Sequence, residues 1–308
     1  MVAPPKLTSS TQSASEAPPA ETPSSPWATA ESKPKQVAGK LPAHLDVWQQ
    51  TLGWQPTAAQ LDLFQQFYAQ IVDGNQRFNL TRITTPEDFW EKHLWDSLSG
   101  LAPWFADDPT QEADEPEDGS EEDGSEVDLP TGPIRIIDIG SGGGIPGIPA
   151  AIALTPIFQS LGQQVALTLL DSTRKKVQFL QETCAHIGIK ATCIADRAET
   201  IGQQPAHRAQ YDLAVVRAVG SAATCAEYAM PLLKEGVQAV LYRGQWSTED
   251  TEALMPVVDL LGGEITDLQT WQTPLTQGTR NCIFIHKDAP TPADFPRAVG
   301  VPAKKPLT

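Results

Sequence analysis

Four glycines stand within residues 140–144 of the 308-residue chain, immediately after a short apolar run at residues 134–138. An apolar run of this length, bounded by turn signals, is typical of a parallel strand that is buried on both faces. Glycine lets the backbone turn sharply and leaves no side chain in the way of a ligand. A helix is expected to begin near Pro146, so this stretch predicts the strand, glycine turn and helix that cradle a nucleotide in a doubly wound sheet.

The residues after the glycines distinguish between the cofactors that such a corner can bind. Pro146 and Pro149 lack the backbone N–H donors that a dinucleotide pyrophosphate needs at the start of a helix. The lysine and hydroxyl of a P-loop are also missing. S-adenosylmethionine carries no phosphate, needs only close backbone approach, and has a sulfonium that tolerates a nearby carboxylate such as Asp138. The sequence therefore favours S-adenosylmethionine over NAD.

An acidic residue ends the second expected strand as well. Asp171 follows the apolar run at residues 165–170, where it is well placed to bind the ribose hydroxyls of an adenosine. NAD sites and methyltransferase sites share this role, so the residue type does not separate them. The spacing argues against NAD, because Asp171 lies 31 residues after Gly140 and the dinucleotide fingerprint places its acid about 20 residues on.

Strand-like and helical patterns alternate through the rest of the chain. Further strands are expected at 191–194, 211–216, 238–241, 264–270 and 281–286, and helices at 174–187 and 222–233. The last two strands are close enough for an antiparallel hairpin at the sheet edge. This alternation predicts an α/β fold with a doubly wound, mostly parallel, Rossmann-like sheet. Ligands bind such sheets beyond the carboxyl ends of the strands, where the sequence places Asp138, Asp171, Glu199, Arg217 and Arg243.

Composition divides the chain into five parts. Residues 1–40 are rich in Pro, Ser, Thr and Ala and are expected to form a disordered tail, because they cannot bury enough apolar surface. Residues 41–104 show the apolar spacing of three helices, the third beginning at Pro86, which predicts an N-terminal helical cap. An acidic insert is expected at 105–130, the cofactor-binding core at 131–287 and a C-terminal tail at 288–308.

The net charge of −16 comes mostly from the insert. Twelve carboxylates and no Lys or Arg lie between residues 107 and 128, so the remainder of the chain carries only −4 and an RNA partner is not disfavoured. No secretory leader and no apolar run of membrane-spanning length occurs, which predicts a cytoplasmic protein without a membrane partner. The four cysteines lack the spacing of a disulfide framework or a zinc site, so we expect buried thiols and no metal.

Several motifs resemble, in order and spacing, the RsmG (GidB) family. They are Asn79-Leu80-Thr81, His93, Asp96-Ser97, the glycine corner at 137–149, Asp171-Ser172 with Arg174-Lys175-Lys176, Arg217-Ala218 and Gly244-Gln245. That family methylates N7 of a guanine in the decoding-region (530) loop of bacterial 16S ribosomal RNA. The resemblance, over about residues 45–287, implies a class I methyltransferase sheet and S-adenosylmethionine as cofactor. It also implies 16S ribosomal RNA or the small ribosomal subunit as partner, no DNA, and a monomer.

Carried over residue by residue, the resemblance implies two groups of site residues. Those expected to contact the cofactor are Gly140, Ile145, Asp171, Ser172, Thr173, Ala198, Glu199 and Arg217. The catalytic candidates, expected near the reacting centre, are Asn79, His93, Arg197 and Arg243. His93 and Asp96 lie three apart on the third cap helix and could share a face, although a histidine satisfied by its neighbours is the simpler interpretation. Arg243 stands where lysine is expected, and the tail and insert resemble cyanobacterial versions rather than compact members.

Methylation at N7 would explain why no D/N-P-P-aromatic motif follows the fourth expected strand. Guanine N7 has a free lone pair and no proton to lose, so transfer needs orientation and neither a nucleophile nor a general base. Enzymes that methylate exocyclic amines carry a D/N-P-P-aromatic motif after strand four, and carbon-5 enzymes need a catalytic cysteine. Here strand four runs into Val216-Arg217-Ala218-Val219. A small-molecule methyltransferase and a non-catalytic ribosome-assembly factor on the same fold remain open, and an NAD-dependent oxidoreductase is disfavoured.

Overall fold

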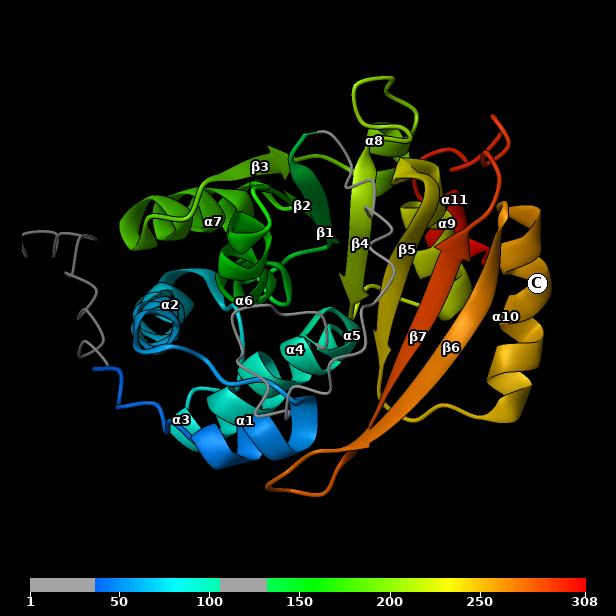
Figure 1. The fold of residues 1–308 in the computed structure, drawn as a ribbon. Helices are drawn as coiled ribbons and strands as arrows, with labels where there is room; N and C mark the ends of the chain where they lie inside the picture. The colour runs from blue at the N-terminus through cyan, green and yellow to red at the C-terminus, as the bar shows by residue number, and fades with distance from the viewer. Residues whose placement is uncertain (1–36, 106–131) are drawn as a thin grey trace, which may run out of the picture. The chain divides into compact units, whose positions relative to one another are not determined.

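Seven strands form one sheet in the order β3-β2-β1-β4-β5-β7-β6 (Figure 1). The computed structural model describes residues 37–105 and 132–308, which belong to a single unit, Gln36–Thr308. The expected N-terminal tail, apart from its last four residues, and the acidic insert, apart from Phe105, lie outside the described residues.

The strand directions confirm the expected fold class. β3, β2, β1, β4 and β5 run parallel, whereas β7 is antiparallel to both β5 and β6. The sheet is therefore the expected doubly wound, mostly parallel, Rossmann-like sheet, with the predicted antiparallel hairpin at its edge, and it has the architecture that the family resemblance implied. The strands are β1 (Ile134–Ile139), β2 (Val165–Asp171), β3 (Ala191–Ala195), β4 (Tyr211–Arg217), β5 (Leu233–Arg243), β6 (Gly263–Gln272) and β7 (Thr279–Lys287).

Successive residues of each central strand pack into two different cores. In β1, Ile136 belongs to one apolar cluster, and Ile137 and Ile139 belong to the other. In β4, Val215 and Val216 divide in the same way. Side chains alternate between the faces of a strand, so the uninterrupted apolar runs in the sequence reflect a sheet that is covered on both sides.

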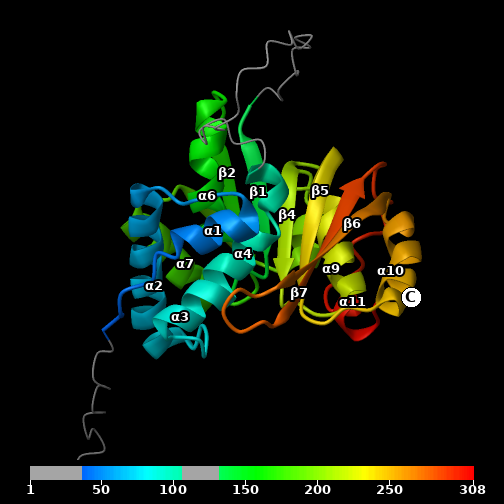
Figure 2. The same ribbon diagram turned by 60° about the horizontal axis from the view of Figure 1, so that its bottom comes forward.

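Two groups of helices provide these covers (Figure 2). The first core holds the cap helices together with α6 (Gly147–Ser160) and α7 (Arg174–Ile187). The second core holds the remaining helices, which are α8 (Ala198–Gly202), α9 (Ala222–Ala229) with the 3₁₀ turn Met230–Leu232, α10 (Thr248–Leu260) and, packed on α9, α11 (Val301–Lys304). Among the described residues, no helix is long and apolar enough to cross a membrane.

The cap begins with two regular helices and continues with an irregular one. α1 (Leu45–Leu52) is followed by α2 (Ala58–Phe78), whose start is fixed by a capping box between Thr57 and Gln60. The expected third helix is divided into α3 (Pro86–Phe89), a π-helical segment (Trp90–Trp95) and α4 (Asp96–Ser99), with a separate short α5 (Ala102–Phe105). A π-helical turn within an α-helix frequently marks a functional site, and this one carries His93.

The C-terminal half contains two features that the sequence did not predict. α10 connects β5 to β6 and begins with a capping box between Ser247 and Asp250. Residues 288–308, expected as a tail, pack against the helices of the second face. Arg297 forms an ion pair of 2.6 Å with the fully buried Glu227 of α9, and Arg208 donates to backbone carbonyls at 291, 292 and 295.

Candidate functional site

The glycine corner is held in place by the carboxylate of Asp171. Gly142 has a left-handed backbone, with φ of 57°, which glycine adopts without steric cost. Its N–H donates to Asp171 Oδ2 over 3.0 Å, and Asp171 Oδ1 accepts the N–H of Thr173 over 2.7 Å. One buried carboxylate thus joins the loop after β1 to the loop after β2. Each of its oxygens retains a lone pair for a further donor.

A pocket of about 200 Å³ opens beside the carboxyl ends of β1, β2 and β3. It brings together five of the eight predicted cofactor residues, namely Gly140, Asp171, Ser172, Ala198 and Glu199. Arg197, predicted near the reacting centre, lines the same pocket. The lining is completed by side chains that the sequence did not single out, chiefly Val219, Tyr228 and Ala303.

The other three predicted cofactor residues lie outside this lining. Ile145 is 9% exposed and packs in the core shared with the cap helices. Thr173 is the residue before α7, and only its backbone N–H is bonded to Asp171. Arg217, at the end of β4, contacts the cap instead.

Glu199 accepts four hydrogen bonds from protein donors, three of them at Oε1. It is 2% exposed, and it accepts a two-pronged contact from Arg197, with Nη2 at 2.9 Å from Oε1 and Nε at 3.2 Å from Oε2. Tyr228 Oη and the N–H of Gly300 also donate to Oε1, over 3.1 and 2.9 Å. Burial raises the pKa of Glu199, but the bonds from Arg197 and Gly300 outweigh it and leave the pKa below its ordinary value. The carboxylate therefore stays charged and holds Arg197 at the pocket.

Asp138, at the end of β1, is buried beside the same corner. Its Oδ2 accepts the N–H of Gly147 over 2.9 Å, at the start of α6, whereas no described protein group bonds its buried Oδ1. Burial is the main cause that raises the pKa of Asp138 to about 7, against the opposing effects of the Gly147 and Ser141 bonds and of the Arg217 charge. This carboxyl is therefore poised between its neutral and charged forms.

Arg217 joins the end of β4 to the π-helical segment of the cap. Its Nη1 donates to Asp96 Oδ2 at 2.5 Å and to the Lys92 carbonyl at 3.0 Å, and its Nη2 donates to His93 Nδ1 at 3.0 Å. A guanidinium has no acceptor, so Nδ1 carries the lone pair and Nε2 carries the proton, which faces Thr81 Oγ1 at 2.9 Å. Burial, and secondly the Arg217 charge, lowers the pKa of His93 to about 3. The imidazole is therefore neutral and its tautomer is fixed.

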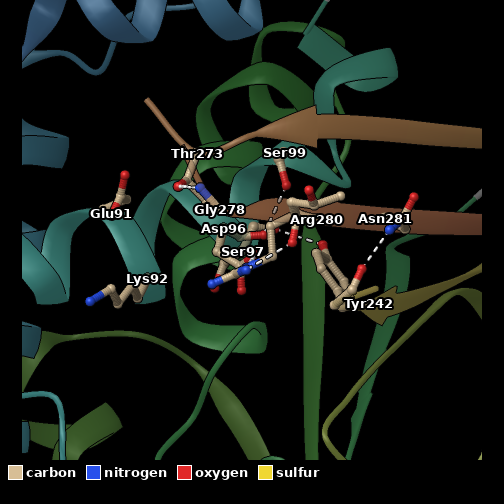
Figure 3. A network of polar contacts seen from close by, with 12 residues as sticks. Glu91, Lys92, Asp96, Ser97, Ser99, Tyr242, Thr273, Gly278, Arg280 and Asn281 are labelled. Atoms are coloured by element: carbon tan, nitrogen blue, oxygen red, sulfur yellow. Dashed lines mark hydrogen bonds and ion pairs between the residues drawn. The ribbon is translucent and has the colours of Figure 1, made fainter. Parts of the chain in front are cut away.

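Asp96 is shared by two arginines. Besides Arg217, it accepts Nε of Arg280 from β7 at 3.0 Å (Figure 3). In the π-helical segment just before Asp96, the buried Glu91 accepts the N–H groups of Leu275 and Thr276 at 2.6 and 2.7 Å, from the loop between β6 and β7. The π-helical segment and Asp96, the first residue of α4, are thus bonded to β4, to β7 and to the hairpin loop, which fixes the cap over the end of the sheet.

Two catalytic candidates lie apart from this network. Asn79 is exposed at the end of α2, where it adopts a left-handed backbone with φ of 50°. Arg243, at the end of β5, donates to the Gly220 carbonyl at 2.6 Å and lies over the ring of Trp246, 5.9 Å from its centroid. Arg243 thereby holds the loop between β4 and α9.

Sequence reasoning did not assign roles to Thr81, Asp96 or Arg280. Thr81 and Asp96 occur in the motifs that carried the family resemblance, which was an available signal. Arg280 lies in β7, between β5 and the edge strand β6, with no motif around it, and only the strand order brings it to Asp96.

Comparison with known proteins identifies a family for nearly the whole described chain. A family model described as rRNA small subunit methyltransferase G (GidB) matches residues 60–111 and 127–277. The ribosomal RNA small subunit methyltransferase G of Trichormus variabilis is 47% identical over 268 residues, 87% of this chain and 98% of its own. The protein of that name from Synechococcus elongatus is 48% identical over 266 residues, 85% of this chain and 97% of its own.

One solved structure with a similar fold shows a much weaker likeness. Magnesium protoporphyrin IX methyltransferase from Synechocystis PCC 6803 covers 51% of this chain and 71% of its own, with 13% identity and a TM-score of 0.36, a likeness too weak to bear on function. The family model and the sequence relatives are decisive. The chain belongs to the rRNA small subunit methyltransferase G (GidB) family.

Proposed function

We propose that this chain transfers the methyl group of S-adenosylmethionine to N7 of a guanine in the decoding-region (530) loop of 16S ribosomal RNA. The observation that carries the proposal is the pocket beside β1, β2 and β3, whose lining residue Asp171 joins the glycine loop after β1 to the loop after β2. Family membership supports ribosomal RNA as the substrate. The enzyme would act as a cytoplasmic monomer on the RNA or the small subunit, with no DNA or membrane partner.

The residues of the corner fit S-adenosylmethionine. A Cβ placed on Gly142 would meet no atom closer than 3.8 Å, so a ligand can approach the main chain there. The remaining lone pairs of Asp171, whose Oδ2 also lies 3.8 Å from Lys176 Nζ, suit two ribose hydroxyls. When bound, S-adenosylmethionine supplies an electrophilic methyl group on its sulfonium.

The residues around Arg217 fit a transfer that needs no general base. His93 cannot take up a proton near neutral pH, because its Nδ1 lone pair accepts from Arg217 and its pKa is about 3. Guanine N7 has no proton to lose, so a base is not required there. We assign His93 and Asp96 the role of positioning Arg217 at the end of β4, where it can orient the reactants.

We assign the contacts with RNA to three polar side chains, of which the two arginines are basic and Arg197 lines the pocket. Single-stranded RNA loops are bound through stacking and phosphate contacts. The side chain of Arg197 is 41% exposed although its guanidinium is held by Glu199, and Arg243 is half-buried over Trp246. Asn79 is exposed on the cap. In this proposal these three side chains bind the substrate, and Ser172, Thr173, Ala198 and Ile145 shape the cofactor side.

The test is methyl transfer from labelled S-adenosylmethionine to 16S RNA and to small subunits, with an RNA in which the target guanine is replaced by adenine as the control. Label should appear in the first two substrates and be lost in the third. A protein that binds the cofactor but labels neither RNA would support a small-molecule methyltransferase. A protein that does not bind the cofactor would support a non-catalytic assembly factor.

A further inference from the structure

The C-terminal segment at residues 297–305 reaches the cofactor pocket. Ala303, in α11, belongs to the pocket lining together with Tyr228 and Val219. The segment lies beyond residue 277, where the family match ends, and neither composition nor motif singled it out. Its position raises the question of whether it only supports α9 or also contacts the ligand.

Three hydrogen-bonded anchors hold this segment against α8 and α9. The Arg297 guanidinium and backbone N–H both bond the carboxylate of Glu227, which is fully buried. Thr224 Oγ1 donates to the Pro302 carbonyl at 3.0 Å. The N–H of Gly300 donates to Glu199 Oε1 at 2.9 Å. The segment is therefore a fixed part of the structure at the point where it meets the pocket.

Glu199 couples the segment to the loop after β3. The same carboxylate that accepts from Gly300 also accepts from Arg197 and Tyr228. Burial raises the pKa of Tyr228 to about 12, so the phenol remains a donor. With four protein hydrogen bonds in place, Glu199 is occupied in aligning two walls of the pocket.

The chemistry of the lining suits the nucleoside end of a ligand. Asp171 is the acceptor for ribose hydroxyls, so the base would lie further from the glycine corner, towards the loop after β3. Leu170, Ala198, Tyr228 and Ala303 line this part of the pocket with apolar and aromatic surface. Such surface is what a flat heteroaromatic base packs against.

We infer that α11 forms the outer wall of the nucleoside subsite, with Ala303 in direct contact with the bound nucleoside and Glu199 as a positioning residue. The inference rests on the proposed binding of S-adenosylmethionine. The C-terminal segment thereby acts as a determinant of cofactor affinity rather than a tail.

The test compares Ala303→Trp with Lys304→Trp, a bulky change at the adjacent exposed residue that is outside the lining. Calorimetry with S-adenosylmethionine and with adenosine should show at least a tenfold loss of affinity for both ligands in Ala303→Trp and less than a twofold change in Lys304→Trp. Thermal unfolding without ligand should be the same in both. Equal affinities in the wild type and Ala303→Trp would overturn the inference, whereas a wild type that binds neither ligand would refute the proposed function itself.

Hydrogen exchange of the unaltered protein gives an independent readout. Added S-adenosylmethionine should slow exchange of the amides at 298–305, and α10 should serve as the unaffected reference because no residue of α10 lines the pocket. Slowed exchange at the glycine corner without any change at 298–305 would show that the segment only supports α9.

Discussion

Arg217 Nη2 donates to His93 Nδ1 across 3.0 Å, and this bond links the end of β4 to the π-helical segment of the cap. The two residues are 124 positions apart in the sequence. The contact places the positive charge of Arg217 against the imidazole of His93, and this charge helps to keep the imidazole neutral. Arg217 retains its donor role only as long as the imidazole stays neutral, and the stability of the protein should therefore respond to pH through His93.

We predict that His93 makes the folded state less stable as the pH falls. The pKa of His93 is about 3 in the folded protein against 6.5 ordinarily, so between these values the unfolded chain binds the extra proton. Stability should fall with decreasing pH by up to about 1.4 kcal/mol per unit. Glutamine cannot be protonated, so the difference in unfolding free energy between the wild type and His93→Gln should show this slope from about pH 6.5 to 4.5.

The comparison with His93→Gln is needed because Asp138 changes the unfolding free energy with pH in the opposite direction. Its pKa is raised to about 7, so its folded form retains a proton that the unfolded chain releases, and this contribution is lost as the pH rises towards 7. Asp138 is present in both proteins and cancels in the difference. A difference that does not vary with pH would show that His93 is already charged or exposed.

Removing the carboxylate of Asp96 should destabilise the protein strongly. Asp96→Ala leaves Arg217 and Arg280 without their shared partner in a site where the three side chains are 10 to 29% exposed. Breaking a largely buried ion pair costs about 3 kcal/mol. Asp88→Ala is the control, since Asp88 is 42% exposed and pairs with Lys92 at the surface, where the cost is about 0.5 kcal/mol or less. Urea unfolding that gave similar losses for both variants would contradict this account of the network.

The central strands β1, β2 and β4 were predictable because each is a short, largely apolar run that ends in a turn signal or a polar residue. Asp171 and Arg217 mark the ends of β2 and β4 as expected. The π-helical segment was not predictable, because a change in backbone hydrogen-bond register leaves no periodic signal in six residues. The short helices α8 and α11 are also below the length at which apolar spacing is informative.

The site was predictable where it consists of a local motif and not where it depends on tertiary contacts. The glycine corner and Asp171 follow from residue type and spacing. The placement of Arg217 does not, because its partners Asp96 and His93 come from the cap and are brought to β4 only by packing. The same holds for Gly300 and Ala303, whose approach to Glu199 and the pocket depends on the course of the chain after β7.

Gly142→Ala and a control glycine variant should lose similar stability, but only Gly142→Ala should lose affinity for S-adenosylmethionine. Its φ of 57° is unfavourable for alanine, at a cost of about 1 kcal/mol in stability, although the added methyl group clashes with nothing. The methyl group would instead occupy the space of the ligand, so we expect affinity for S-adenosylmethionine to fall at least tenfold. Gly162→Ala is the matched control, with φ of 74° and no atom within 4 Å of its Cβ, but in the turn between α6 and the start of β2, whereas Gly142 is bonded to Asp171 of the pocket lining. Calorimetry that found the same affinity in both variants would place the cofactor away from the corner.

Arg243 should be required for methyl transfer and not for cofactor binding. It lies outside the lining of the nucleoside pocket, and its guanidinium bonds Gly220 and covers Trp246. With Arg243→Ala we expect transfer to 16S RNA to fall tenfold or more, about 1.4 kcal/mol, while the affinity for S-adenosylmethionine changes less than twofold. Arg243→Lys keeps the charge at a position where the family is expected to have lysine, and should retain most of the activity.

The salt dependence of RNA binding shows whether Arg243 acts through a phosphate. Each phosphate contact to a single strand adds about 0.7 to the slope of log affinity against log salt, so the slope should decrease by that amount in Arg243→Ala and stay unchanged in Arg243→Lys. Arg135→Ala removes one charge near the start of β1, at the opposite end of the sheet, and should leave the slope as it is. If Arg243→Ala lowers transfer without changing the slope, Arg243 acts by holding the loop at Gly220. Full transfer by Arg243→Ala would exclude both roles and place the RNA elsewhere on the surface.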